Sequence, residues 1–115
     1  GNLTIIDDAY SANVTGFEAA INFLKKFHGY KIVVTPGITE LGSKTREIHN
    51  KLGKLLDQVA DLVVFVGKNE RTESLSQSLS QSKVVFVDSV SQWQKFVNPN
   101  RKTVLLFEND LPDNY

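Results

Sequence analysis

The 115-residue chain contains no cysteine. Disulfide bonds and thiolate metal sites are therefore excluded, and the thiol content says only that the chain is compatible with the cytosol. No apolar run approaches the roughly 20 residues that a membrane-spanning helix needs. A secretory signal is also missing, and strand-like residues begin at Leu3. We expect a cytoplasmic protein without a membrane partner and, because the chain starts almost inside a strand, a fragment of a longer polypeptide.

The chain also carries no net charge, because thirteen basic residues balance thirteen acidic ones. The sequence has no dense basic cluster of the kind that nucleic acids and anionic membranes require. Hydrophobic residues make up 41% of the chain and charged residues 23%, which are ordinary values for a globular protein. We therefore expect one folded domain over residues 1–115, without nucleic acid as its partner.

The two main glycine-rich phosphate-binding motifs are absent. Gly-x-Gly-x-x-Gly does not follow the first strand-like run, and the P-loop pattern Gly-x-x-x-x-Gly-Lys-Ser/Thr occurs nowhere. If this domain contacts a nucleotide, it does so through side chains or at the ribose end, without a triphosphate site of its own.

Strand-like and helix-like segments alternate along the chain. Five short, almost continuously apolar runs are typical of strands covered on both faces, at residues 3–7, 31–35, 62–66, 84–87 and 103–107. Helical spacing predicts four helices, at residues 15–27, 43–60, 70–81 and 90–97. The third has only Leu75 and Leu79 to bury, which favours a solvated helix on the rim. The pattern predicts an α/β fold, a three-layer Rossmann-like sandwich around a mostly parallel sheet of about five or six strands.

The first strand-like run ends in two carboxylates, Asp7 and Asp8, and Tyr10 and Asn13 follow closely. Ligands of parallel α/β sheets bind outside the carboxyl ends of the strands. Two acids, a phenol and an amide are costly to cluster unless solvent, a metal or a ligand meets them. The alternative is that one aspartate caps a turn while the other is solvated, since Asp and Asn are ordinary turn residues.

Two more strand ends deliver polar groups to the same edge. The second strand runs into a loop at residues 35–42, in which Gly37 is available for a positive φ and which by itself could be turn chemistry. The last strand is followed by Glu108, Asn109 and Asp110. Acids or amides at several strand ends favour a ligand-facing edge. The histidines, His28 and His49, have no companion at metal-site spacing, and their local pattern is typical of structural or solvated residues.

Residues 6–13, Ile-Asp-Asp-Ala-Tyr-Ser-Ala-Asn, resemble the D-D-S-Y-N-A-N-P signature that opens the C-terminal domain of Mur ligases, and of their MurF branch in particular. Other family motifs follow in order over residues 3–107: Ala19-Ala20 in the first helix, Glu40-Leu41-Gly42 of the V-L-G-D-M-x-E-L-G segment, His49 and Gly53 of the H-x-x-x-G helix, and residues 61–67 of the D-x-V-x-x-V-G strand. Each motif is short, but their order and spacing together are specific.

The resemblance implies the C-terminal domain of an ATP-dependent amide ligase of peptidoglycan precursor synthesis. In that family a central domain supplies the P-loop and the Mg²⁺ ligands, and the C-terminal domain closes over ATP and presents an amino substrate to an acyl phosphate. The domain alone would be inactive, with no catalytic residue and no metal ligand of its own. Its partners would be the protein's own N-terminal and central domains, a UDP-muramoyl-peptide, and D-Ala-D-Ala or a related amine. The resemblance implies a nucleotide-side surface at Asp8, Tyr10 and Asn13, and a substrate cleft lined or supported by Glu40, Leu41, Gly42 and His49.

The chain departs from the family pattern in ways that bear on the substrate. Ala9 replaces Ser, Ser11 replaces Asn, Val14 replaces Pro, and residues 35–37 replace Gly-Asp-Met. Many members end the last strand in Lys-Gly-Ser-Arg, where this chain has Phe107-Glu108-Asn109-Asp110. Exchanging two cations for two anions changes which ligand charges this edge can accept. A related ligase for another amino compound is therefore an alternative.

Two other classes stay open. One is a stand-alone α/β ligand-binding or interaction module without chemistry. The other is a receiver-like domain, which would suit Asp7 and Asp8 but lacks the expected aspartate at the third strand end, Val66-Gly67.

Overall fold

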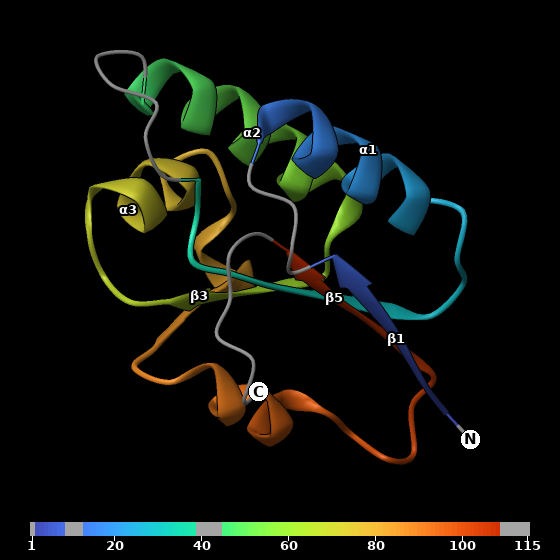
Figure 1. Ribbon diagram of the computed structural model, residues 1–115. Helices are drawn as coiled ribbons and strands as arrows, with labels where there is room; N and C mark the ends of the chain where they lie inside the picture. The colour runs from blue at the N-terminus through green and yellow to red at the C-terminus, as the bar shows by residue number, and fades with distance from the viewer. Residues whose placement is uncertain (1, 9–12, 39–44, 109–115) are drawn as a thin grey trace.

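The computed structural model describes residues 2–8, 13–38 and 45–108. Strands, helices and short 3₁₀ helices follow one another along these residues (Figure 1). The elements are β1 (Leu3–Asp8), α1 (Val14–Leu24), β2 (Tyr30–Thr35), α2 (Thr45–Val59), β3 (Leu62–Val66), α3 (Glu70–Ser76), η2 (Gln81–Lys83), β4 (Val84–Val87), η3 (Val90–Phe96) and β5 (Thr103–Glu108).

The strands form one parallel sheet with the order β1-β5-β2-β3-β4. Each of the five predicted strands is confirmed to within one residue at either end. β5, the last strand in the chain, lies inside the sheet between β1 and β2, and all six of its residues are buried. β1 lies at the edge, and its Leu3 and Ile5 are exposed.

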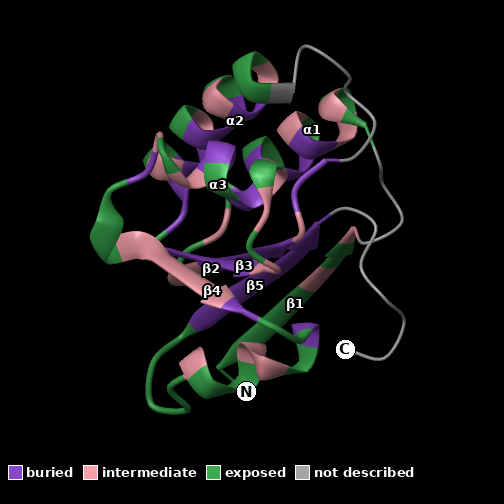
Figure 2. Ribbon diagram, turned by 90° about the vertical axis from the view of Figure 1, so that its left-hand side faces the viewer, coloured by how far each residue is buried: buried purple, intermediate pink, exposed green. Residues whose placement is uncertain are grey.

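Helices α1, α2 and α3 cover one face of the sheet, and η3 lies against the other (Figures 1 and 2). Alternate residues of a strand point to opposite faces, so Val104 and Leu106 of β5 join the core under the helices, whereas Leu105 and Phe107 pack with Val90 and Trp93 of η3. The predicted three-layer α/β architecture is therefore confirmed.

The prediction of a third helix over residues 70–81, solvated on the rim, is wrong in both its length and its position. α3 ends at Ser76, and i→i+3 bonds at Ser78 and Leu79 tighten the chain beyond it. The backbone N–H of Ser80 then donates to Asp57 of α2, at 2.9 Å. α3 also packs closely on α2, because a Cβ built at Gly53 would lie 2.5 Å from the carbonyl oxygen of Leu75. A contact between helices, absent from the local pattern, decided the length and position of α3.

The predicted fourth helix forms, but as the 3₁₀ helix η3. Val90, Trp93 and Phe96 recur every three residues; Val90 is buried in the core of this face, and Trp93 and Phe96 are partly buried against it. A 3₁₀ helix has three residues per turn, so this spacing places the three side chains on one stripe.

Among the described residues, no helix is both long enough and apolar enough to cross a membrane.

Candidate functional site

Two acidic side chains meet at the carboxyl-end edge of the sheet. β1 and β5 are parallel neighbours in a register that pairs Asp8 with Glu108. Ile6 and Leu106 precede them by two residues and pack in the core under the helices, so both carboxyl groups lie on the α1 side of the sheet. The expectation that strand ends bring acids to one edge is confirmed for this pair.

Glu108 is fully buried, at 0% exposure. Neither of its carboxyl oxygens has a hydrogen-bond partner of standard geometry in the described part of the chain. Burial raises the pKa of Glu108 to about 10, and Asp8 adds to the rise through a loose hydrogen bond and through charge repulsion. Glu108 is therefore protonated at neutral pH. The sequence placed this residue at the ligand-facing edge, but its burial follows from the central position of β5.

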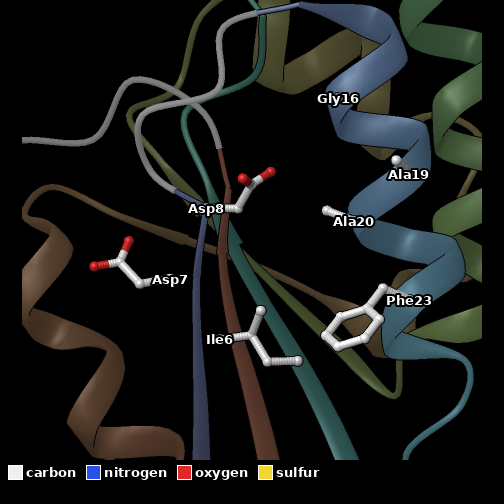
Figure 3. A pocket seen from close by; sticks show the side chains of 7 residues that line it. All are labelled: Ile6, Asp7, Asp8, Gly16, Ala19, Ala20 and Phe23. Carbon is white, nitrogen blue, oxygen red and sulfur yellow. The ribbon is translucent and has the colours of Figure 1, made fainter.

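A pocket of about 330 Å³ lies between the end of β1, at Asp8, and α1. Figure 3 shows Asp8, Ala20 and Phe23 on one side of β1, whereas the carboxylate of Asp7 points toward the opposite face. Apart from the two aspartates the lining is apolar or small: Ile6, Gly16, Ala19, Ala20 and Phe23. The pocket thus combines one carboxylate with a hydrocarbon wall.

Asn13 has a structural role at the entrance to α1. Its side-chain Oδ1 accepts a 2.7 Å hydrogen bond from the backbone N–H of Gly16 and caps the helix. This helix cap is compatible with a purely structural turn and equally with a ligand contact at Asn13. Tyr10, the other residue expected on the nucleotide side, lies outside the described residues.

The side chains of Thr35 and His49 hold the loop after β2 by accepting hydrogen bonds from its backbone. Gly37 has the positive φ expected of it, 82°, and its backbone N–H donates to Thr35 Oγ1 at 3.1 Å. The backbone N–H of Ile38 donates to Nε2 of His49, at 3.0 Å. His49 is fully buried on α2, so the structure places it beneath the loop as a support. Glu40, Leu41 and Gly42 lie outside the described residues, and their role at a substrate cleft stays a prediction.

Arg71 of α3 is a site neighbour that the sequence did not reveal. Its Nε lies 3.5 Å from the carbonyl oxygen of Pro36, and its Cβ would be 2.8 Å from a Cβ added at Gly37. Only the tertiary packing of α3 brings it to this loop. The structure therefore divides the predicted residues into two groups, with Asp8 and Asn13 near α1 and His49 under the β2 loop.

Within the part of the chain that the structure describes, no three His, Cys, Asp or Glu side chains are grouped in a way that could hold a metal ion.

A family model described as "Mur ligase, glutamate ligase domain" matches residues 1–107. The chain is 31% identical over 109 residues to the UDP-N-acetylmuramoyl-tripeptide–D-alanyl-D-alanine ligase of Haemophilus influenzae, covering 91% of this chain and 24% of that protein. It is 30% identical over 81 residues to the ligase of the same name from Escherichia coli, covering 70% of this chain and 18% of the relative.

Solved structures agree. The MurF ligase of Thermotoga maritima, in complex with ADP, matches with a TM-score of 0.78 and 28% identity over 94% of this chain and 25% of that one. MurF from Acinetobacter baumannii matches with a TM-score of 0.78 and 25% identity, over 95% of this chain and 25% of that one. The chain spans about a quarter or less of the length of these relatives. It therefore belongs to the Mur ligase C-terminal, or glutamate ligase, domain family.

Proposed function

We propose that this chain is the C-terminal domain of a MurF-like, ATP-dependent amide ligase of peptidoglycan precursor synthesis. The observation that carries the proposal is the match of nearly the whole chain to one domain of MurF ligases, at the level of both sequence and fold. The full-length protein would join D-Ala-D-Ala, or a related amine, to a UDP-muramoyl-peptide. A cytoplasmic location belongs to the same proposal, because ATP and a nucleotide-linked substrate are consumed together.

The proposed reaction has two steps. ATP transfers its γ-phosphoryl group to a substrate carboxylate, giving an acyl phosphate and ADP. The neutral amine then attacks the acyl carbon, an amide bond forms, the bond to phosphate breaks, and the amine loses a proton. The acyl phosphate is labile in water, so domain closure serves to align the amine and to exclude solvent.

This domain would contribute binding surfaces to that reaction. Asp8 lines a pocket, and its carboxylate can accept hydrogen bonds from ribose hydroxyls. Asn13 keeps the N–H donors of its amide for the nucleotide while its oxygen caps α1. Tyr10 completes the proposed nucleotide side. Glu40, Leu41 and Gly42 are proposed to face the amino substrate, and His49 supports their loop through Ile38.

ATP and Mg²⁺ would be held mainly by the protein's central domain. The P-loop pattern is absent from the sequence, and no metal-binding trio occurs among residues 2–8, 13–38 and 45–108. The residues present fit contact with the sugar and base of a nucleotide rather than with its triphosphate. We therefore expect the isolated domain to be inactive, and its partners to be its own N-terminal and central domains.

The test is ATP hydrolysis by the full-length protein with UDP-muramoyl-tripeptide present and amines added one at a time. Turnover that requires D-Ala-D-Ala or one related amine supports the proposal and names the substrate. Absence of amine-dependent turnover from a protein with an intact P-loop would overturn it.

A stand-alone ligand-binding or interaction module is the second candidate, favoured by the accessible pocket at Asp8. The natural gene distinguishes the two functions. A reading frame of several hundred residues with an upstream P-loop supports the ligase, whereas a frame confined to about these residues supports the module.

A further inference from the structure

A buried histidine holds the loop that follows β2. His49 on α2 is at 0% exposure, and its Nε2 accepts a 3.0 Å hydrogen bond from the backbone N–H of Ile38. Ile38 is itself buried, at 1% exposure. We propose that His49 is a pH-sensitive latch, which holds residues 36–38 against α2 while its imidazole is neutral and releases them in acid while the sheet stays folded.

The first support is the direction of the hydrogen bond. An imidazole nitrogen accepts only when it carries no proton, so the ring proton of neutral His49 must be on Nδ1. Protonation of Nε2 turns this acceptor into a donor, which then faces the N–H of Ile38. The contact therefore exists in one protonation state alone.

The second support is the cost of a positive charge at this place. Burial disfavours the charged form of an imidazole. Arg71 of α3 brings a positive charge to the same loop, because its Nε lies 3.5 Å from the carbonyl oxygen of Pro36. A Cβ added at Gly37 would lie 2.8 Å from Cβ of Arg71 and 3.4 Å from Nε2 of His49, so both side chains flank one residue of the loop. A protonated His49 gains free energy by reaching water, and the loop above it must move for that to happen.

The other ionisable groups around His49 remain in contact with solvent. On the described elements packed here, which are α1, α2, α3, β2 and β3, none of these groups is buried. They are Glu18, Arg46, Glu47, Lys51, Lys54, Asp57, Glu70, Arg71, Glu73, Tyr30 and Lys31. His49 is therefore the ionisable residue of these elements whose access to protons depends on the position of the loop.

Proton binding sets the expected pH range. An imidazole in water takes up a proton at about pH 6.5. The released loop thus binds a proton that the latched loop excludes, and its population should rise by up to about tenfold per pH unit below that value. Under the proposed function this loop leads to Glu40, Leu41 and Gly42, so acid would also weaken binding of the amino substrate.

The test is NMR of the 115-residue chain between pH 8 and pH 5. At pH 8 the ¹⁵N shift of Nε2 in His49 should be that of a nitrogen without a proton. Amide hydrogen exchange, corrected for the intrinsic rate at each pH, then measures opening at Ile38. We expect the protection of Ile38 to fall by up to about tenfold per pH unit below pH 6.5. The amides of Val64 in β3 and Leu105 in β5 should keep their protection, because local opening leaves the core folded.

Two variants assign the pH dependence to one residue. His49→Gln retains an acceptor but cannot titrate, so the protection of Ile38 should no longer vary with pH in this variant. His28→Gln is the matched control, because it removes the other histidine of the chain, which is exposed beyond the end of α1. This control should retain the wild-type pH dependence.

The proposal is overturned if the protection of Ile38 is the same at pH 8 and pH 5, or if Val64 and Leu105 lose protection together with it. Loss of the pH dependence in His28→Gln would overturn it as well. Comparison of Ile38 with Val64 in the wild type decides the matter even if His49→Gln does not fold. The measurement uses this chain alone, so its failure would leave the proposed ligase function standing.

Discussion

Nε2 of His49 on α2 accepts a 3.0 Å hydrogen bond from the backbone N–H of Ile38, three residues beyond the end of β2. Both residues are buried. An imidazole nitrogen can accept only when it carries no proton, so this contact defines the neutral form of His49 as the one that holds the loop.

Loss of this acceptor should destabilise the domain. His49→Phe leaves the buried N–H of Ile38 unsatisfied, and we expect the free energy of unfolding to fall by about 1–3 kcal/mol. His49→Gln, which restores an acceptor oxygen, should lose less. Urea unfolding followed by Trp93 fluorescence measures both, with the exposed Lys51→Ala as the control. Equal stability of His49→Phe and wild type would show that the hydrogen bond does not hold the loop.

Close packing of α2 on α3 requires glycine at position 53. A Cβ at Gly53 would lie 2.5 Å from the Leu75 carbonyl oxygen and 2.9 Å from Cβ of Ser78. Gly53→Ala should therefore cost about 1–3 kcal/mol by overpacking, although alanine is the better helix former. The exposed neighbour Lys54→Ala is the control in the same urea titration. A stabilised Gly53→Ala would mean that the two helices can separate without cost.

Glu108 should make the domain less stable as the pH rises. Its pKa is raised from 4.5 to about 10 in the folded state, so between these values the folded chain binds a proton that the unfolded chain has released. Stability is therefore greatest below pH 4.5 as far as this group is concerned, and it falls toward pH 10 by at most about 1.4 kcal/mol per pH unit. In Glu108→Gln this slope should disappear.

Urea midpoints at pH 5, 7 and 9 measure that slope. The exposed Glu70→Gln is the matched control and should retain the wild-type slope. Parallel pH profiles for wild type and Glu108→Gln would contradict a protonated Glu108.

Asp57 should anchor the chain at Ser80, four residues beyond the end of α3. The backbone N–H of Ser80 is the main group that lowers the pKa of Asp57, and Lys83 at 3.8 Å contributes. A lowered carboxyl pKa gives stability that is present above about pH 4 and is lost as the pH falls through the folded value. Asp57→Ala should speed hydrogen exchange of the Ser80 amide at pH 7, whereas Asp57→Asn, which keeps an acceptor, should do so less. Unchanged exchange in Asp57→Ala would rule out this anchor.

Local pattern was enough to locate the strands. A run such as Leu62–Val66, which has no polar interruption, requires cover on both faces, and this requirement produces a parallel sheet between helices. The same local logic succeeded at Gly37, whose positive φ follows from a turn that glycine adopts without strain. Residues 9–12 and 39–44, which carry much of the predicted site, lie outside the described structure, and their roles stay predictions.

The sequence by itself determined the five strands, the α/β class and, through motif order, the family, because these depend on spacings within short segments. Only the tertiary structure decided the order of the strands, and with it the insertion of β5 between β1 and β2. That insertion buries Glu108 beside Asp8 and leaves β1 at an exposed edge, while the packing of a separate helix seats His49 under Ile38. Such contacts join residues far apart in the chain, and their energies depend on burial, which no local pattern records.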